Sequence, residues 1–163
     1  MGEKKLEQNQ AEEPMTMFQR ALLTGFVGGL LWGSLGSLAY YFNFTTISHA
    51  SYILRSFFNA SWVHGWMGEL ISIVIVSMLS ILAAIVYYVV LKKRRGMIPG
   101  ILYGIGIWVV FVYFLNPIFT AVPTFNNLNA DTLVTTLCLH VLYGTFVGYT
   151  ISYDYYNAMH KTT

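Results

Sequence analysis

Long apolar runs separated by short polar stretches dominate the chain. Residues 70–91 and 97–115 contain no charged side chain, and each run is about the 20 residues that a helix needs to cross the hydrocarbon core of a bilayer. Between them stand Lys92, Lys93, Arg94, Arg95 and Gly96, which leave room only for a tight turn. Because Lys and Arg concentrate in cytoplasmic loops, the pattern predicts a transmembrane hairpin with a cytoplasmic turn.

Two further apolar runs flank this hairpin. We therefore expect an all-α, polytopic membrane protein with four transmembrane helices, over residues 21–42, 63–91, 97–115 and 132–153. The four spans form one domain, residues 18–156, between polar tails at 1–17 and 157–163. A cytoplasmic turn puts both termini in the cytoplasm as well (N-in/C-in), so eight of the nine Lys and Arg residues lie inside and Arg55 alone lies outside.

Composition agrees with a multi-pass membrane protein. The chain is 56% hydrophobic and only 10% charged, against about a quarter charged in soluble domains. The single cysteine, Cys138, excludes an intramolecular disulfide and a multi-cysteine metal site, and its apolar surroundings suggest a small buried side chain. The four cations at 92–95 could suggest a nucleic-acid site, but the positive-inside rule already explains them. We therefore expect the lipid bilayer, and no nucleic acid, as a partner.

The segments outside the spans carry local signals. Residues 43–61 mix aromatic and polar side chains, which indicates a short helix in the membrane interface or a partial re-entry. Asp131 stands just before the fourth span and is expected to be its N-cap.

Glycines recur at every fourth position in three of the spans, so they share helix faces. Such faces let another helix approach closely, as in a glycine zipper, and a glycine-lined pore is a minority alternative. The predicted helix-packing glycines are Gly25, Gly29, Gly33, Gly96, Gly100, Gly104, Gly144 and Gly148.

Glu69 is the acidic residue within the predicted spans. A carboxylate inside a membrane is costly and needs a partner, so Glu69 is a candidate proton or cation site. Because the uncharged run begins only at Leu70, solvation in the headgroup region is an equally good interpretation. Arg55 and His64 are the candidate partners of this carboxylate.

His140 follows Asp131 by nine residues, which places it about 14 Å along the helix and near mid-membrane. Its imidazole is expected to hydrogen-bond across helices, or else to carry protons together with Glu69. A metal site would need His49, His64, His140 and Glu69 to converge without any recognisable spacing, so we expect no metal and no cofactor. No G-x-S-x-G or Ser/Lys pattern occurs, so we do not expect an enzyme.

Several stretches resemble the YqhR-type membrane proteins of spore-forming, Bacillus-like bacteria. The similarity extends over nearly the whole chain, and the stretches that carry it are residues 3–10, 24–30, 99–104, 116–119, 135–138 and 143–149. The resemblance implies a bacterial plasma-membrane protein with several spans, and it implies no activity.

Two hypotheses of function follow. The first is a non-enzymatic membrane component that acts through helix packing with itself or with another membrane protein, motivated by the glycine faces. It predicts that leucine at Gly29 or Gly100 breaks assembly. The second is a small transporter or an ion- or proton-pathway subunit that uses Glu69 and His140.

Overall fold

The computed structural model describes residues 15–161, so most of the predicted N-terminal tail lies outside the described part. Four of its helices are long and apolar enough to cross a membrane, and no strand occurs among the described residues. The all-α, four-span prediction is therefore confirmed. The elements are α1 (Met17–Tyr41), α2 (His49–Ile53), the 3₁₀ helix η1 (Ser61–His64), α3 (Trp66–Leu91), α4 (Ile98–Val109), the π-helical turn η2 (Val110–Leu115), the 3₁₀ helices η3 (Asn116–Ile118) and η4 (Phe125–Asn127), and α5 (Ala130–Lys161).

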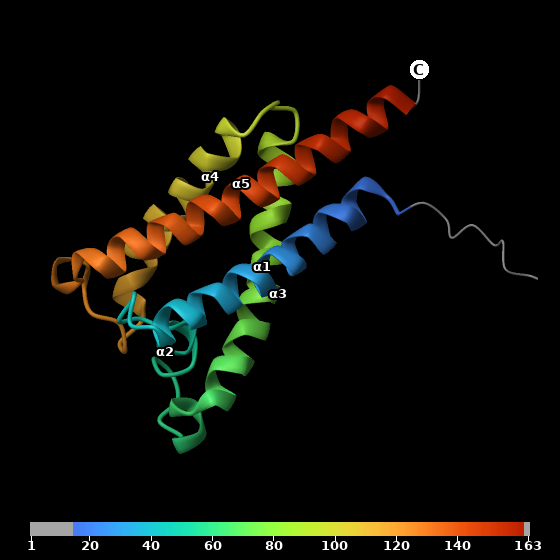
Figure 1. The fold of residues 1–163 in the computed structure, drawn as a ribbon. Coiled ribbons are helices and arrows are strands. Elements are labelled where there is room, and N and C mark those ends of the chain that lie inside the picture. Colours follow the sequence, from blue (N-terminus) through green and yellow to red (C-terminus); the bar gives the residue numbers. More distant parts are fainter. Residues whose placement is uncertain (1–14, 162–163) are drawn as a thin grey trace, which may run out of the picture.

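The long helices pack as two pairs (Figure 1). α3 crosses α1 steeply, α4 lies along α5, and α1 contacts α5 to join the pairs. The turn 92–97, the start of α1 and the end of α5 lie at one end of the bundle, which we call the basic side. The segments 42–65 and 119–129 lie at the other end, which we call the loop side. The turn on the basic side depends on Gly96, whose φ of 95° is disfavoured for other residues.

Helix ends differ from the expected spans where capping groups fix them. α1 starts earlier because Thr16 and Gln19 form a capping box, and it ends at Tyr41, with Phe42 as its C-cap. The next residue, Asn43, has a φ of 61° and turns the chain away from the helix. α5 begins before Asp131, since the backbone N–H of Thr132 donates to Oδ1 of Asn129 at 3.3 Å. The prediction that Asp131 is the N-cap is wrong, although its carboxylate still lies in the positively polarised first turn.

Glycines bring the backbones of α1 and α3 together. A Cβ atom at Gly25 would lie 2.7 Å from the Cβ of Ala84, and one at Gly29 would lie 2.5 Å from the Cα of Ser77. Real Cβ atoms do not approach this closely, so only glycine fits at both positions. The small residues therefore determine where the two helices cross.

The α4–α5 pair is built in the same way. A Cβ atom at Gly100 would lie 2.7 Å from the carbonyl oxygen of Gly144, and one at Gly148 would lie 2.7 Å from the Cα of Gly100. Gly104 also lies against the backbone of α5, at His140 and Val141. Most of the predicted packing glycines thus serve contacts within one chain. The prediction is wrong for Gly96, which lies in the turn, where a Cβ atom would meet nothing within 4 Å.

Ser80 links three of the long helices. Its hydroxyl donates to the carbonyl oxygen of Gly25 on α1 at 2.6 Å. The Tyr143 hydroxyl on α5 lies 2.7 Å from Oγ of Ser80, and it also donates to the carbonyl oxygen of Ser80 at 3.1 Å. Around this link lies the buried core of Ala21, Ala84, Tyr87, Tyr143, Val147 and Ile151.

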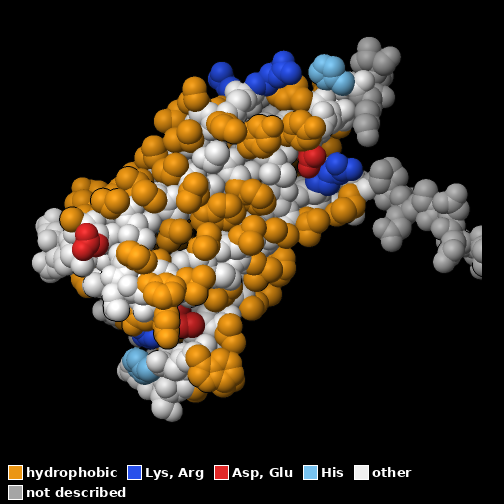
Figure 2. All heavy atoms as spheres, viewed as in Figure 1, with side chains coloured by type: hydrophobic (Ala, Val, Ile, Leu, Met, Phe, Trp, Pro, Cys, Tyr) orange, Lys and Arg blue, Asp and Glu red, His pale blue; other side chains and the backbone are white. Residues whose placement is uncertain are grey.

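Exposed hydrophobic side chains occur along all four long helices, and Figure 2 shows one face of this surface. Hydrophobic side chains cover the length of the bundle in this view, while Lys and Arg gather toward its ends. Cys138 is exposed on this surface, so the prediction of a buried cysteine is wrong. In a membrane protein an apolar side chain is as stable against lipid as in the core, so apolar sequence does not by itself indicate burial.

Leucine at Gly29 or Gly100 should weaken the fold of a single chain. Overpacking against backbone should cost roughly 1–3 kcal/mol, seen as a lower unfolding temperature of the full chain in detergent. Leucine at Ser34, which is exposed on α1, and at Gly106, where a Cβ would meet nothing within 4 Å, are the matched controls. Equal unfolding temperatures for all four variants would contradict this packing.

Candidate functional site: a cavity between the helices

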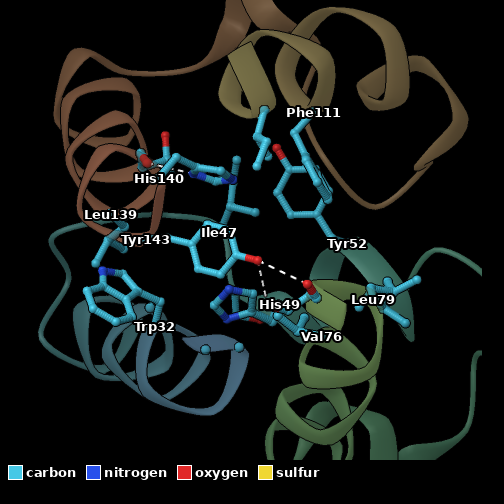
Figure 3. Close-up of a pocket in the computed structure, with 18 of the residues that line it drawn as sticks. Trp32, Ile47, His49, Tyr52, Val76, Leu79, Phe111, Leu139, His140 and Tyr143 are labelled. Atoms are coloured by element: carbon cyan, nitrogen blue, oxygen red, sulfur yellow. Dashed lines mark hydrogen bonds between the residues drawn. The ribbon is translucent and has the colours of Figure 1, made fainter. Parts of the chain in front are cut away.

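A cavity of about 160 Å³ lies where the four long helices meet α2 (Figure 3). Its walls are predominantly apolar and come from every long helix. The polar side chains of its lining include His49 and Tyr52 from α2, Ser80 from α3, and Thr136, His140 and Tyr143 from α5. Two histidines from distant parts of the sequence therefore face one space.

Local contacts on α1 and α2 position His49. The Ser48 hydroxyl accepts the backbone N–H of Ser51 at 3.1 Å and so starts the helical turn of α2. The imidazole packs against Gly36 of α1, where a Cβ atom would overlap the ring. Within the described residues, Nδ1 of His49 is buried and has no hydrogen-bond partner.

Burial controls the charge of His49. Its enclosure lowers the pKa from 6.5 to about 4, and a charge on the nearby His140 would lower it further. His49 is therefore neutral at pH 7. Next to it on α2, burial raises the pKa of Tyr52 to about 12, which keeps that phenol neutral too. This part of the cavity wall carries no charge at neutral pH.

His140 makes its hydrogen bond within its own helix. Nδ1 lies 2.7 Å from the carbonyl oxygen of Thr136, and the ring packs against Phe111 at a centroid distance of 5.7 Å. The expected bond across helices is not the one observed, because the preceding turn of α5 already offers an acceptor. With Nδ1 engaged, Nε2 is the ring nitrogen left for other partners.

Aromatic rings close the cavity wall. Trp32 packs on Phe146 at 5.1 Å and edge-on to Tyr143 at 6.4 Å. Its indole N–H is buried and has no acceptor among the described residues. Unpaired buried polar groups are rare, and each calls for an explanation such as a bound water or ligand.

Glu69 lies elsewhere, in an ion pair on the loop side. Its Oε1 is 3.2 Å from a guanidinium nitrogen of Arg55, and Ser37 donates to its Oε2 at 3.2 Å. The two charged side chains are only 18% and 15% exposed. Arg55 also donates to Ser51 at 3.0 Å, so the pair fastens the segment after α2 to α3 and α1.

The structure therefore separates the residues that the sequence analysis grouped. His140 lines the cavity, Glu69 pairs with Arg55 outside the cavity lining, and His64 is exposed in η1. Of the two candidate partners of Glu69, Arg55 is the one in contact. Among the described residues, no group of three or more His, Cys, Asp or Glu side chains is placed to hold a metal ion.

Several cavity residues were missed in the sequence. Trp32 and Tyr143 lie near the middle of their helices, away from the membrane interfaces where Trp and Tyr usually gather. That unusual position was a usable signal. The convergence of His49 on His140 was not visible, since it depends on how α2 folds back into the bundle.

Four membrane-length helices with an apolar outer surface define a multi-pass α-helical membrane protein. The family described as "Conserved membrane protein YqhR" matches residues 1–163, and the chain belongs to this family, as its resemblance predicted. It is similar to "Uncharacterized protein YqhR" of Bacillus subtilis (strain 168), with 42% identity over 159 residues, covering 94% of this chain and 89% of the relative. Among solved structures, none matches this chain.

Acid should destabilise the fold through His49. Between pH 6.5 and 4 the unfolded chain binds a proton at His49 that the folded chain does not, so stability falls as the pH falls through this window. The slope from this one group is at most about 1.4 kcal/mol per pH unit. The measurement is the unfolding temperature of the full chain in detergent between pH 7 and pH 4.

A glutamine at His49 should flatten this dependence, because it fills similar space and does not titrate. Glutamine at the exposed His64 is the matched control and should keep the wild-type slope. If His49→Gln and His64→Gln show the same pH dependence as wild type, His49 is not enclosed as described.

Proposed function

We propose that this protein is a non-enzymatic, multi-pass plasma-membrane protein that binds a small, neutral molecule in the cavity between its helices. The molecule is mostly apolar and carries one hydrogen-bonding group. The observation that carries the proposal is the meeting of His49 and His140 in one predominantly apolar cavity. Such a pocket, apolar with a few convergent polar groups, is the usual form of a small-molecule site.

The size of the cavity limits its ligand. Its volume of about 160 Å³ is close to that of an apolar cavity of about 150 Å³ that accepts benzene. A ligand with one ring, or an aliphatic group of similar volume, fits this space. The uncharged His49 favours a neutral ligand, and an imidazole nitrogen can accept a hydrogen bond from a hydroxyl or N–H group.

The glycine faces support this proposal over assembly with a partner. Gly25 and Gly29 are occupied by α3, and Gly100, Gly144 and Gly148 are occupied within the α4–α5 pair. These faces are therefore not free to receive a second copy or another membrane protein.

The position of Glu69 supports binding over ion or proton transport. A relay between Glu69 and His140 needs both groups on one path, but Glu69 is held by Arg55 and Ser37 and is not in the cavity lining. The ion pair with Arg55 explains why the Glu69 carboxylate is buried, and no transported ion is needed to explain it.

We also propose that the basic side faces the cytoplasm. Arg20 and the four cations at 92–95 lie on the basic side, and among the described residues Arg55 is the cation on the loop side. This asymmetry follows the positive-inside rule. Labelling of a cysteine at position 94, in a Cys138→Ser background, by a membrane-impermeant reagent added outside intact cells would contradict the orientation.

Two fluorinated probes of nearly equal shape test the cavity. Para-fluorophenol carries a hydroxyl group, and para-fluorotoluene carries a methyl group in its place. Fluorine NMR of each probe, with the full chain in nanodiscs and with empty nanodiscs, should show saturable binding to the protein. One hydrogen bond is worth about 1 kcal/mol, so the phenol should bind about fivefold more tightly.

Phenylalanine variants identify the acceptor. His49→Phe and His140→Phe keep a ring in the cavity wall and remove the nitrogen atoms, so one of them should erase the preference for the phenol while the toluene still binds. His64→Phe is the matched control on the surface. The proposal fails if neither probe binds above empty nanodiscs, or if the preference persists in both cavity variants.

A further inference from the structure

A second hollow, separate from the histidine cavity, opens on the surface between α3 and α4. These helices follow each other directly in the sequence, yet each packs mainly on another partner, α3 on α1 and α4 on α5. The gap between them forms a groove of about 760 Å³. Its lining is apolar apart from Tyr103 and Arg94, and the Tyr103 hydroxyl is already bonded to the carbonyl oxygen of Ala83 at 2.5 Å.

Gly106 lines this groove and adds no side chain to it. Gly100 and Gly104 on the same helix are explained by the close backbone of α5, but a Cβ atom at Gly106 would meet nothing within 4 Å. A glycine in a helix interior costs roughly 0.5–1 kcal/mol relative to alanine. No packing contact requires a glycine at position 106, and this position lines the open groove.

The groove is long enough for an acyl chain of one lipid leaflet. Along α4 and η2 its lining extends from Ile98 to Phe111, which is about 20 Å at 1.5 Å per residue. Half of a hydrocarbon core of about 30 Å is about 15 Å. The groove starts at the basic side, so it can hold an acyl chain of the leaflet on that side. Its volume is about five times that of a cavity that holds benzene.

Arg94 stands at the end of the groove, where a headgroup would lie. Lys92 is placed over the ring of Tyr88 at 3.9 Å, and Arg95 over Tyr156 at 4.5 Å. The Arg94 side chain is exposed, and no ion pair or ring contact holds it within the described part of the chain. A guanidinium that lines an apolar groove matches the phosphate of a lipid whose chain fills that groove.

We propose that the groove between α3 and α4 binds an anionic phospholipid from the leaflet on the basic side. One acyl chain lies along α4 past Gly106, and the phosphate pairs with Arg94. Basic pockets between transmembrane helices are typical headgroup sites. This site is distinct from the proposed small-molecule cavity, although Ala83, Ile107 and Phe111 contribute to both walls.

Native mass spectrometry of the full chain in neutral detergent tests the site. The protein is offered equal amounts of phosphatidylglycerol and phosphatidylcholine with identical acyl chains. Both lipids carry a phosphate, but the choline cation of phosphatidylcholine offsets its charge. One arginine near the headgroups is worth about 1 kcal/mol, so wild type should retain phosphatidylglycerol about fivefold in excess. Arg94→Gln should abolish the excess, and Lys93→Gln, an exposed neighbour without a ring contact, should keep it.

Gly106→Leu tests the acyl-chain part, because its side chain enters the groove without a backbone clash. It should lower the retention of both lipids. If this variant fails to fold, Leu102→Trp, at an exposed lining residue, fills the same groove.

Any of four results would overturn the proposal. The first is equal retention of both lipids by wild type, and the second is equal loss of the excess in Arg94→Gln and Lys93→Gln. The third is displacement of phosphatidylglycerol by inorganic phosphate, which would mean a site for soluble anions. Unchanged retention in a folded groove-filling variant would also exclude a chain in the groove.

Discussion

Close contact between helix backbones is the constraint on which the rest of this structure depends. Inside a bilayer the hydrophobic effect does not drive helices together, so association relies on van der Waals packing and hydrogen bonds. Glycines supply the contact surfaces at the α1–α3 crossing and along the α4–α5 pair. Ser80 then joins the two pairs by its bonds to Gly25 and Tyr143.

The same packing explains where the empty spaces lie. Glycine contacts draw α3 toward α1 and α4 toward α5, so the helices of the central hairpin are held apart from each other. Two hollows result, the cavity lined by His49 and His140 and the more open groove between α3 and α4. α2 closes the cavity, and the pair of Arg55 and Glu69 holds the segment after α2 in place. The carboxylate of Glu69 thus holds the segment after α2 against α3 and α1.

Sequence reasoning predicted the four spans, since span length and the basic turn follow from the bilayer thickness and from Lys/Arg placement. It also found the glycines, whose spacing requires a close neighbour, but could not say which helix that neighbour is. The sequence did not show which apolar residues are buried in the protein, because lipid and protein core favour the same side chains. Cys138 is an example, since it was expected to be buried and is exposed. His49 and His140 are far apart in the chain, and only the fold of residues 42–65 brings them to one cavity.

X-ray diffraction from crystals of the full chain pressurised with xenon tests the central claim most directly. Xenon enters dry, apolar cavities of about this size. We predict a xenon peak in the space bounded by His49, His140 and Tyr143, with Glu69 still paired to Arg55. A cavity filled by a chain of ordered waters that continues toward Glu69 would contradict the account, and it would make a transport pathway the better explanation of the two histidines.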